Sequence, residues 1–210
     1  MQASLFDKSD STSVQQLIAS EDGSDVKIWP QFIALAQADK WLLELTHHIL
    51  WQQRAITVYG KRHLQPRLIA WYGDEGIRYR YSGDTLLALP WTQPLGALRT
   101  LCEQQSDVAF NSVLLNRYRD GQDAMGWHSD NESELGSSPV IASVSLGQAR
   151  RFDLRHRQTR EKRSVFLPHG SLLVMAGNTQ VHWEHQIPRS KKITGERINL
   201  TFRRVEPSAS

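Results

Sequence analysis

Cysteine is nearly absent from this chain, since Cys102 is the only one among 210 residues. A single cysteine excludes an intramolecular disulfide and cannot provide a cluster of thiolate metal ligands. The chain also lacks any apolar run approaching the roughly 18 residues of a membrane-spanning helix, so we expect no membrane association. Its amino terminus has neither the basic nor the apolar region of a secretory signal peptide, and we therefore expect a cytoplasmic protein.

The excess of charge of one sign is also small. The formal net charge is +3, and the hydrophobic content of 40% is ordinary for a globular domain. Basic residues are nevertheless concentrated in a few segments, at 150–151, 155–163 and 189–192. Such segments are most often solvated loops, but beside a catalytic pocket they are what binding to a phosphate backbone requires.

No internal repeat and no second domain is visible along the sequence. Residues 1–25 are rich in Ser, Asp and Gln and lack apolar periodicity, so we predict a flexible tail there and a single domain over 26–210. One helix is expected to begin near an N-cap at Asp39. A second is expected to begin at Pro94 and to run to about Gln105.

Short strands separated by turns are expected over the rest of the chain. Several fall between residues 56 and 81. Many short strands at regular spacing predict a mainly β protein with flanking helices (α+β), arranged as a jelly-roll-like double sheet. The strands expected in the second half are 113–118, 142–146, 151–154, 164–167, 171–176, 182–186 and 197–204.

Two histidines and one aspartate are candidates for a metal site. Two imidazoles and one carboxylate on one face of a mononuclear non-haem Fe(II) centre leave coordination positions open for a co-substrate and O2. His128 and Asp130 are two residues apart, which on a strand places both side chains on one face. His185 follows far enough along the chain to return on an adjacent strand. His182 is an alternative third ligand, although strand alternation turns it away from the face of His185.

The segment 197–203 alternates polar and apolar residues in a pattern that is unusual for a core strand. Ile198, Leu200 and Phe202 would share one face, so the opposite, polar face is expected to line a site. Two arginines on that face predict binding of a short dicarboxylate, because a guanidinium donates two parallel charge-assisted hydrogen bonds to a carboxylate. The residues of the polar face are Arg197, Asn199, Thr201 and Arg203.

Six short motifs occur in one order over the second half, and together they closely resemble the AlkB family. These are Fe(II)- and 2-oxoglutarate-dependent oxygenases that remove alkyl groups from nucleic-acid bases. The resemblance extends more weakly upstream to about Trp51, and Val140 departs from the pattern by replacing an Ile. The motifs are 116–118 (Asn-x-Tyr), 128–132 (His-x-Asp-x-Glu), 139–147 (Pro-Val-x-Ala-Ser-x-Ser-x-Gly), 169–175 (His-Gly-Ser-Leu-Leu-x-Met), 183–185 (Trp-x-His) and 197–203 (Arg-x-Asn-x-Thr-Phe-Arg).

The resemblance implies a double-stranded β-helix oxygenase core over about 107–205, preceded by a nucleotide-recognition segment over about 51–90. It implies Fe(II) as the metal, 2-oxoglutarate as co-substrate, and O2. The implied activity is oxidative demethylation of N-alkylated bases in DNA, with RNA left open, and release of formaldehyde, succinate and CO2. The implied metal ligands are His128, Asp130 and His185.

Five residues would bind the co-substrate by the same resemblance. Arg197 would pair with the far carboxylate of 2-oxoglutarate, and Arg203 would lie nearer the metal-bound end. Asn116 and Tyr118 would donate to 2-oxoglutarate oxygens, and Asn199 would orient these groups.

A further set of residues would recognise the base, which must leave its stack to reach a buried metal. Tyr81 would stack on the base opposite the ring of His128, and Tyr79 would contact its edge or a phosphate, with ordinary sheet packing as the alternative for both tyrosines. Glu132 would accept from the exocyclic amine of adenine or cytosine. Tyr59 lies in a segment similar to the hairpin by which duplex-acting relatives insert an aromatic wedge.

Several alternatives stay open at this point. The segment 127–130 (Trp-His-Ser-Asp) is more similar to relatives that prefer single strands, so strand preference is undecided. Besides a demethylase, the chain could be a nucleic-acid-binding module without turnover, or an oxygenase with the same cofactors that acts on protein or a small molecule. The complete set of candidate ligands argues against the first alternative, and the basic segments argue against the second.

The amino-terminal residues Gln2 to Phe6 (Gln-Ala-Ser-Leu-Phe) resemble the short peptides that dock on bacterial replication sliding clamps. Such a peptide needs an exposed tether, a glutamine that forms hydrogen bonds and two adjacent apolar anchors. The sequence therefore predicts a sliding clamp as a partner. The alternative is that Leu5 and Phe6 fold back on the domain.

Overall fold

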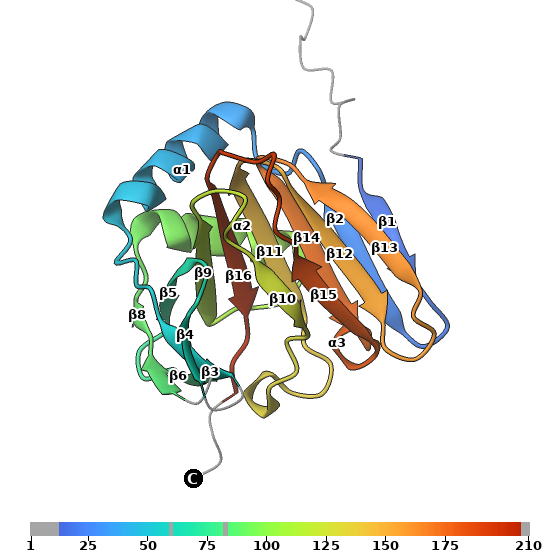
Figure 1. The fold of residues 1–210 in the computed structure, drawn as a ribbon. Coiled ribbons are helices and arrows are strands. Elements are labelled where there is room, and N and C mark those ends of the chain that lie inside the picture. Colours follow the sequence, from blue (N-terminus) through green and yellow to red (C-terminus); the bar gives the residue numbers. More distant parts are fainter. Residues whose placement is uncertain (1–12, 59–60, 82–83, 207–210) are drawn as a thin grey trace, which may run out of the picture.

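The computed structural model describes residues 13–58, 61–81 and 84–206, and it confirms the expected mainly β fold with flanking helices. Two sheets face each other in a jelly-roll arrangement (Figure 1). In spatial order, the larger sheet consists of β1 (Gln15–Ala19), β2 (Ser24–Trp29), β14 (Ser171–Gly177), β11 (Ile141–Gly147), β16 (Arg197–Arg203), β9 (Ser112–Tyr118), β5 (Leu68–Gly73) and β8 (Leu89–Pro90). The smaller sheet consists of β10 (Met125–His128), β15 (Trp183–Ile187), β12 (Arg150–His156) and β13 (Lys162–Leu167).

Two separate hairpins and the helices complete the described structure. Strand β3 (Ala55–Val58) pairs with β4 (Lys61–Leu64), and β6 (Arg78–Tyr81) pairs with β7 (Asp84–Leu87). Both hairpins belong to the expected nucleotide-recognition segment. None of the helices in the described ranges is long and apolar enough to cross a membrane. The helices are α1 (Leu35–His48), α2 (Gln93–Ser106), the single turn α3 (Thr179–His182) and a 3-10 turn at Ser133–Leu135.

Helices α1 and α2 cover the outer face of the larger sheet, and this contact buries the larger hydrophobic cluster (Figure 1). Helix α2 has Pro94 in its first turn, as predicted, and it buries Leu95 and Leu98 completely. From α1, Ala38 and Leu45 pack into the same cluster. Each buried leucine stabilises the fold by about 1.5–3 kcal/mol, so the packing of α1 and α2 stabilises the larger sheet on its outer face.

Strand β16 lies in the middle of the larger sheet, where β11 and β9 pair with its two edges. Its apolar residues Ile198, Leu200 and Phe202 belong to the cluster beneath the helices, as the alternation predicts. Since alternate side chains point to opposite faces, the polar residues of β16 face the smaller sheet. The predicted polar face therefore lies in the space between the two sheets.

The predicted boundary of the flexible tail at residue 25 is wrong, because β1 and β2 already belong to the larger sheet. Ile18 and Val26 are buried in the cluster between the sheets. The apolar residues of this region are few and are separated by a polar turn, so the sequence gives little sign of the strands. Strand β2 takes its place in the sheet by pairing with β14. Residues 1–12, which include the clamp-like segment 2–6, lie outside the described residues.

Asp39 is not the N-cap of the first helix. Helix α1 begins at Leu35 after Ala34, which has an extended conformation with φ −57° and ψ 137°. Asp39 lies inside α1, and its Oδ1 is 3.2 Å from Nε2 of His169. Nδ1 of His169 in turn accepts a hydrogen bond from the backbone N–H of Gly147 at 2.8 Å. The aspartate therefore serves a tertiary contact rather than the start of the helix.

Candidate metal and co-substrate site

The two candidate histidine ligands lie opposite each other on paired strands. His128 ends β10, His185 lies in β15, and the two are register partners in this antiparallel pair. Their ring centroids are 4.2 Å apart. The ligand atoms offered by these two rings and by Asp130 all lie within 4.8 Å of one another. The fold therefore brings the three predicted ligands together.

Asp130 reaches the two histidines from a loop and not from a strand, so the predicted strand alternation is wrong here. Strand β10 ends at His128, after its pairing with β15 shifts register. Two partners hold the loop: Oδ1 of Asp130 accepts from Nη2 of Arg203 at 2.7 Å, and its backbone N–H donates to Oε1 of Gln180 at 2.9 Å. These two contacts, and not strand geometry, therefore orient the carboxylate of Asp130.

Hydrogen bonding and burial set the ionisation of the three groups. Nδ1 of His128 lies 2.8 Å from the carbonyl of Gly126, and because a carbonyl can only accept, the ring donates there and keeps Nε2 for a ligand. Burial lowers the pKa of His128, and burial together with the adjacent His128 ring lowers the pKa of His185 to about 3. Burial alone would raise the pKa of Asp130, but Arg203 and the two imidazoles outweigh it and lower that pKa to about 2. Neutral imidazoles and an ionised carboxylate are the forms that bind a divalent metal.

Arg197 lies at the other end of the polar face of β16 and is 1% exposed. Burial lowers the pKa of its guanidinium to about 10, so it stays positively charged at neutral pH. Its Nη2 donates to Oγ of Ser145 at 2.9 Å, and its Cζ lies 5.2 Å from the ring centre of Tyr118. Nε and Nη1 have no hydrogen-bond partner within the described ranges. Because buried donors are nearly always satisfied, a carboxylate ligand would complete this environment.

The two candidate asparagines are register partners on β9 and β16, and each has a fixed orientation. Oδ1 of Asn116 accepts from Nε of Arg67 at 2.7 Å, which leaves its Nδ2 as a donor toward a ligand. Nδ2 of Asn199 donates to Oγ of Ser143 at 2.8 Å and to the carbonyl of Val144 at 3.0 Å. Asn199 is thus held by β11, which agrees with an orienting role more than with direct binding.

A pocket between the two sheets joins the metal-ligand candidates to Arg197. Sequence reasoning gave no site role to Ser143, which lines the pocket, or to Ser145, which accepts from Arg197, although their spacing of two on a strand is a readable signal. It also missed the apolar lining, which would strengthen electrostatic interactions in the pocket by lowering the local dielectric constant. The apolar lining residues are Leu114, Met125, Phe152, Met175 and Ile187.

The predicted base-recognition residues are described to different extents. Glu132 lines the pocket, and its Oε2 is buried without a hydrogen-bond partner in the described part of the chain. Tyr79 and Tyr81 occupy alternate positions of β6, of which the backbone alone is described. Tyr59 lies outside the described residues. Glu132 is therefore the member of this set that the structure places at the pocket.

A second group of metal-binding residue types consists of Asp22, His156 and His182. Nδ1 of His156 accepts from the backbone N–H of Thr159 at 3.0 Å, so its Nε2 carries the hydrogen and faces Oδ2 of Asp22 at 3.2 Å. A ring in this tautomer has no lone pair for a metal between it and Asp22. His182 stacks on His156 with ring centroids 5.9 Å apart, which places it away from the His128 ring and in a structural cluster.

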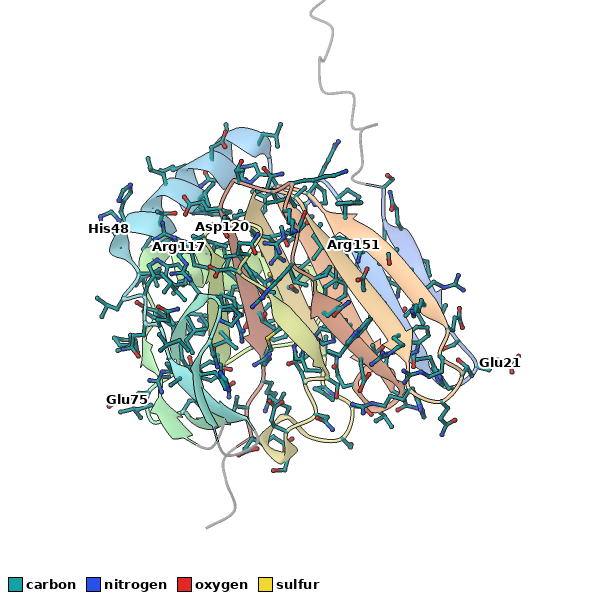
Figure 2. The ribbon with its side chains drawn as sticks, viewed as in Figure 1. Glu21, His48, Glu75, Arg117, Asp120 and Arg151 are labelled. Atoms are coloured by element: carbon teal, nitrogen blue, oxygen red, sulfur yellow. The ribbon has the colours of Figure 1, made fainter. Side chains whose placement is uncertain are left out.

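The basic segments are divided between the two ends of the smaller sheet. The turn 157–161 follows β12 beside α3, and Nη2 of Arg157 donates to Oγ of Ser129 at 2.6 Å, next to the candidate metal ligands. Arg151, labelled in Figure 2, lies near the beginning of β12, at the other end of the sheet, and 189–192 follows β15 there. The turn 157–161 is therefore next to the candidate metal ligands, whereas Arg150 lies near the co-substrate end of the pocket, with its Cζ 5.5 Å from the ring centre of Tyr118.

Known proteins resemble this chain in sequence, and a solved structure resembles it in fold. The 2OG-Fe(II) oxygenase superfamily matches residues 25–203. Alpha-ketoglutarate-dependent dioxygenase alkB homolog 3 of Mus musculus is 40% identical over 210 residues, covering 94% of this chain and 72% of that protein. DNA oxidative demethylase ALKBH2 of Mus musculus is 41% identical over 184 residues, covering 82% and 77%. The solved structure of OsALKBH1 has a TM-score of 0.61 at 15% identity, covering 85% of this chain and 97% of that one, which concerns the fold alone.

Proposed function

The chain belongs to the AlkB family of Fe(II)- and 2-oxoglutarate-dependent dioxygenases, and from this we propose that it oxidatively demethylates N-alkylated bases in nucleic acid, with DNA as the favoured polymer. The observation that carries the proposal is a single pocket with different chemistry at its two ends. Two neutral imidazoles and an ionised carboxylate meet at one end. At the other end lies the buried guanidinium of Arg197, with two nitrogens that have no hydrogen-bond partner among the described residues.

The residues of the pocket fit the metal and the co-substrate. His128 through Nε2, His185 and a carboxylate oxygen of Asp130 would hold Fe(II), a ligand set typical of non-haem Fe(II) oxygenases. Arg197 would bind the far carboxylate of 2-oxoglutarate by charge-assisted hydrogen bonds. When bound, Fe(II) with 2-oxoglutarate and O2 would oxidise the N-alkyl carbon, with succinate, CO2 and formaldehyde as products.

The remaining residues of the site would orient the co-substrate and protect it from water. Asn116 and Tyr118 would donate to its oxygens, and Asn199, fixed by β11, would keep this side of the pocket in place. Arg203 keeps the carboxylate of Asp130 ionised and directed inward. The apolar side chains from both sheets would keep the pocket dry.

Base recognition is proposed for four residues, of which Glu132 lines the pocket. The buried Oε2 of Glu132, which has no hydrogen-bond partner in the described ranges, is suited to accept from the exocyclic amine of adenine or cytosine. Tyr79 and Tyr81 would hold the flipped base, and Tyr59 would act as the wedge that opens a duplex. The basic turn 157–161 lies at the end where a phosphate backbone would pass.

Succinate release that depends on a methylated oligonucleotide tests this function. Purified protein with Fe(II) and 2-oxoglutarate is expected to release succinate and formaldehyde faster with 1-methyladenine or 3-methylcytosine oligonucleotides than with unmethylated ones. Single-stranded, duplex and RNA substrates in the same assay decide strand and polymer preference. Binding without succinate release would identify a non-catalytic module, and release stimulated by peptides or small molecules but not by methylated bases would identify a different oxygenase.

We further propose that residues 2–6 dock the enzyme on a bacterial replication sliding clamp, because a glutamine followed by Leu5 and Phe6 has the pattern of clamp-binding peptides. The parent protein is expected to bind purified clamp, and the Leu5→Ala, Phe6→Ala double variant is expected to lose this binding while keeping its demethylase activity. Surface plasmon resonance with immobilised clamp measures the binding of parent and variant, and succinate release measures their activity. Equal binding by parent and variant, or no binding by the parent, would refute this role.

A further inference from the structure

Helix α3 is a single turn that connects β14 to β15, and its first residues are tied firmly to the larger sheet. Oγ1 of Thr179 donates to the carbonyl of Ala176 at 2.6 Å and accepts from the backbone N–H of Asp25 at 3.1 Å. Nδ2 of Asn178 donates to the carbonyl of Asp22 at 2.7 Å. These contacts join α3 to the β1–β2 hairpin, so a side chain that leaves α3 starts from a rigid base.

Gln180 is the side chain that crosses from α3 to the loop of Asp130, and it is 1% exposed. Its Oε1 accepts the backbone N–H of Asp130 at 2.9 Å, and its Nε2 lies 3.4 Å from Sδ of Met175. The orientation of the amide is determined, because a backbone N–H can bond only to the oxygen. Asp130 lies beyond the end of β10, so Gln180 accepts the backbone N–H that a neighbouring strand would otherwise bind.

We propose that Gln180 is a positioning residue for the metal site, which fixes the carboxylate ligand relative to the histidine ligands. It acts through Asp130 and not through the metal, since it holds the main chain of Asp130 while Arg203 holds the side chain. It is also five residues before His185 in the chain, so one turn of helix joins the loop of one ligand to the strand of another. Substitution of a residue that hydrogen-bonds to a metal ligand commonly lowers metal affinity by about ten- to a hundredfold.

The test compares Gln180→Met, which keeps the length and volume of the side chain but removes the acceptor, with Gln180→Glu, which keeps an acceptor oxygen. The inference rests on the proposed metal site, so Co(II), a redox-stable probe of an Fe(II) site, is titrated into the metal-free full chain by calorimetry. Gln180→Met is expected to bind Co(II) about ten- to a hundredfold more weakly than the parent, and Gln180→Glu is expected to recover most of this loss. Val181→Met provides a matched control, because Val181 is on the same turn and is 51% exposed.

The outcomes separate this inference from the proposed function. If the parent binds Co(II) and releases succinate but Gln180→Met binds Co(II) equally well, Gln180 has no positioning role. If Gln180→Met only lowers the melting temperature of the metal-free protein, its role is structural and the inference is overturned. If the parent itself does not bind Co(II), the metal site is refuted and this inference falls with it.

Discussion

His128→Ala and His185→Ala are each expected to abolish 2-oxoglutarate turnover while the protein stays folded. Each change removes one of three ligand atoms that lie within 4.8 Å of one another, and two ligands do not hold Fe(II) in the geometry that turnover requires. The fold is expected to survive because β10 and β15 stay paired through their backbones. Succinate release and Co(II) binding measure the loss, and circular dichroism measures the fold.

The control for these variants is His48→Ala. His48 is an exposed histidine near the end of α1, labelled in Figure 2, and it lies outside the pocket. It is expected to keep parental turnover. Full turnover in His128→Ala or His185→Ala, with the control active as well, would show that the metal is held elsewhere.

Asp130 requires a different substitution to give the same information. Its carboxylate pairs with buried Arg203 at 2.7 Å, and breaking a buried ion pair from one side costs about 3–5 kcal/mol. An alanine variant would therefore combine loss of the ligand with loss of stability. Asp130→Asn also removes the charge, but it keeps the shape of the side chain and an oxygen that can accept from Arg203, so it is expected to lose less stability than alanine and to give the cleaner measure of ligation.

The strands that frame the site could be predicted from the sequence because their patterns are local. In β16 the apolar residues alternate with Arg197, Asn199 and Arg203, and the period of two fixes which face each side chain occupies. Helix α2 was equally readable, since Pro94 marks its start and buried leucines follow at helical spacing. Local periodicity thus gave both the sheet and the side of the sheet on which the pocket lies.

The features that the sequence did not reveal depend on partners far along the chain. Strand β2 is stabilised by β14, about which its own residues carry no information. Asp130 seemed to need a strand, yet Gln180 and Arg203 hold it in a loop. Asp39 is a residue type common at N-caps, and its contact with His169 is visible only in three dimensions. In each case a tertiary contact outweighs the local preference.

The assignment of three residues as metal ligands and five as co-substrate residues stays a prediction, but the structure gives it a physical basis. A polar strand face in a core is costly unless its groups are satisfied. Asn199 and Thr201 satisfy each other and β11, and Arg203 is paired with Asp130. Arg197 keeps Nε and Nη1 buried without a hydrogen-bond partner in the described chain, so a carboxylate ligand would complete its environment.

Arg197→Lys is therefore expected to weaken 2-oxoglutarate binding by about ten- to a hundredfold and to leave nucleic-acid affinity close to that of the parent. Hydrogen bonds to charged groups contribute about 1.5–3 kcal/mol, and a lysine replaces the planar fork with a single point charge. The stacking of the guanidinium near Tyr118, at 5.2 Å, is lost as well. Calorimetric titration of 2-oxoglutarate into the Co(II)-loaded protein and fluorescence anisotropy with a labelled oligonucleotide measure the two affinities separately.

The matched control is Arg117→Lys, on the neighbouring strand β9. Arg117 is the register partner of Ile198, so the two side chains share the face of the sheet that is opposite to Arg197. There Arg117 pairs with Glu196 at 2.8 Å, outside the pocket. Figure 2 labels it. The control is expected to bind 2-oxoglutarate as the parent does, because it makes the same chemical change without touching the pocket. An equal loss of both affinities in Arg197→Lys would mean that Arg197 supports the fold, and unchanged 2-oxoglutarate affinity would place the far carboxylate on another residue.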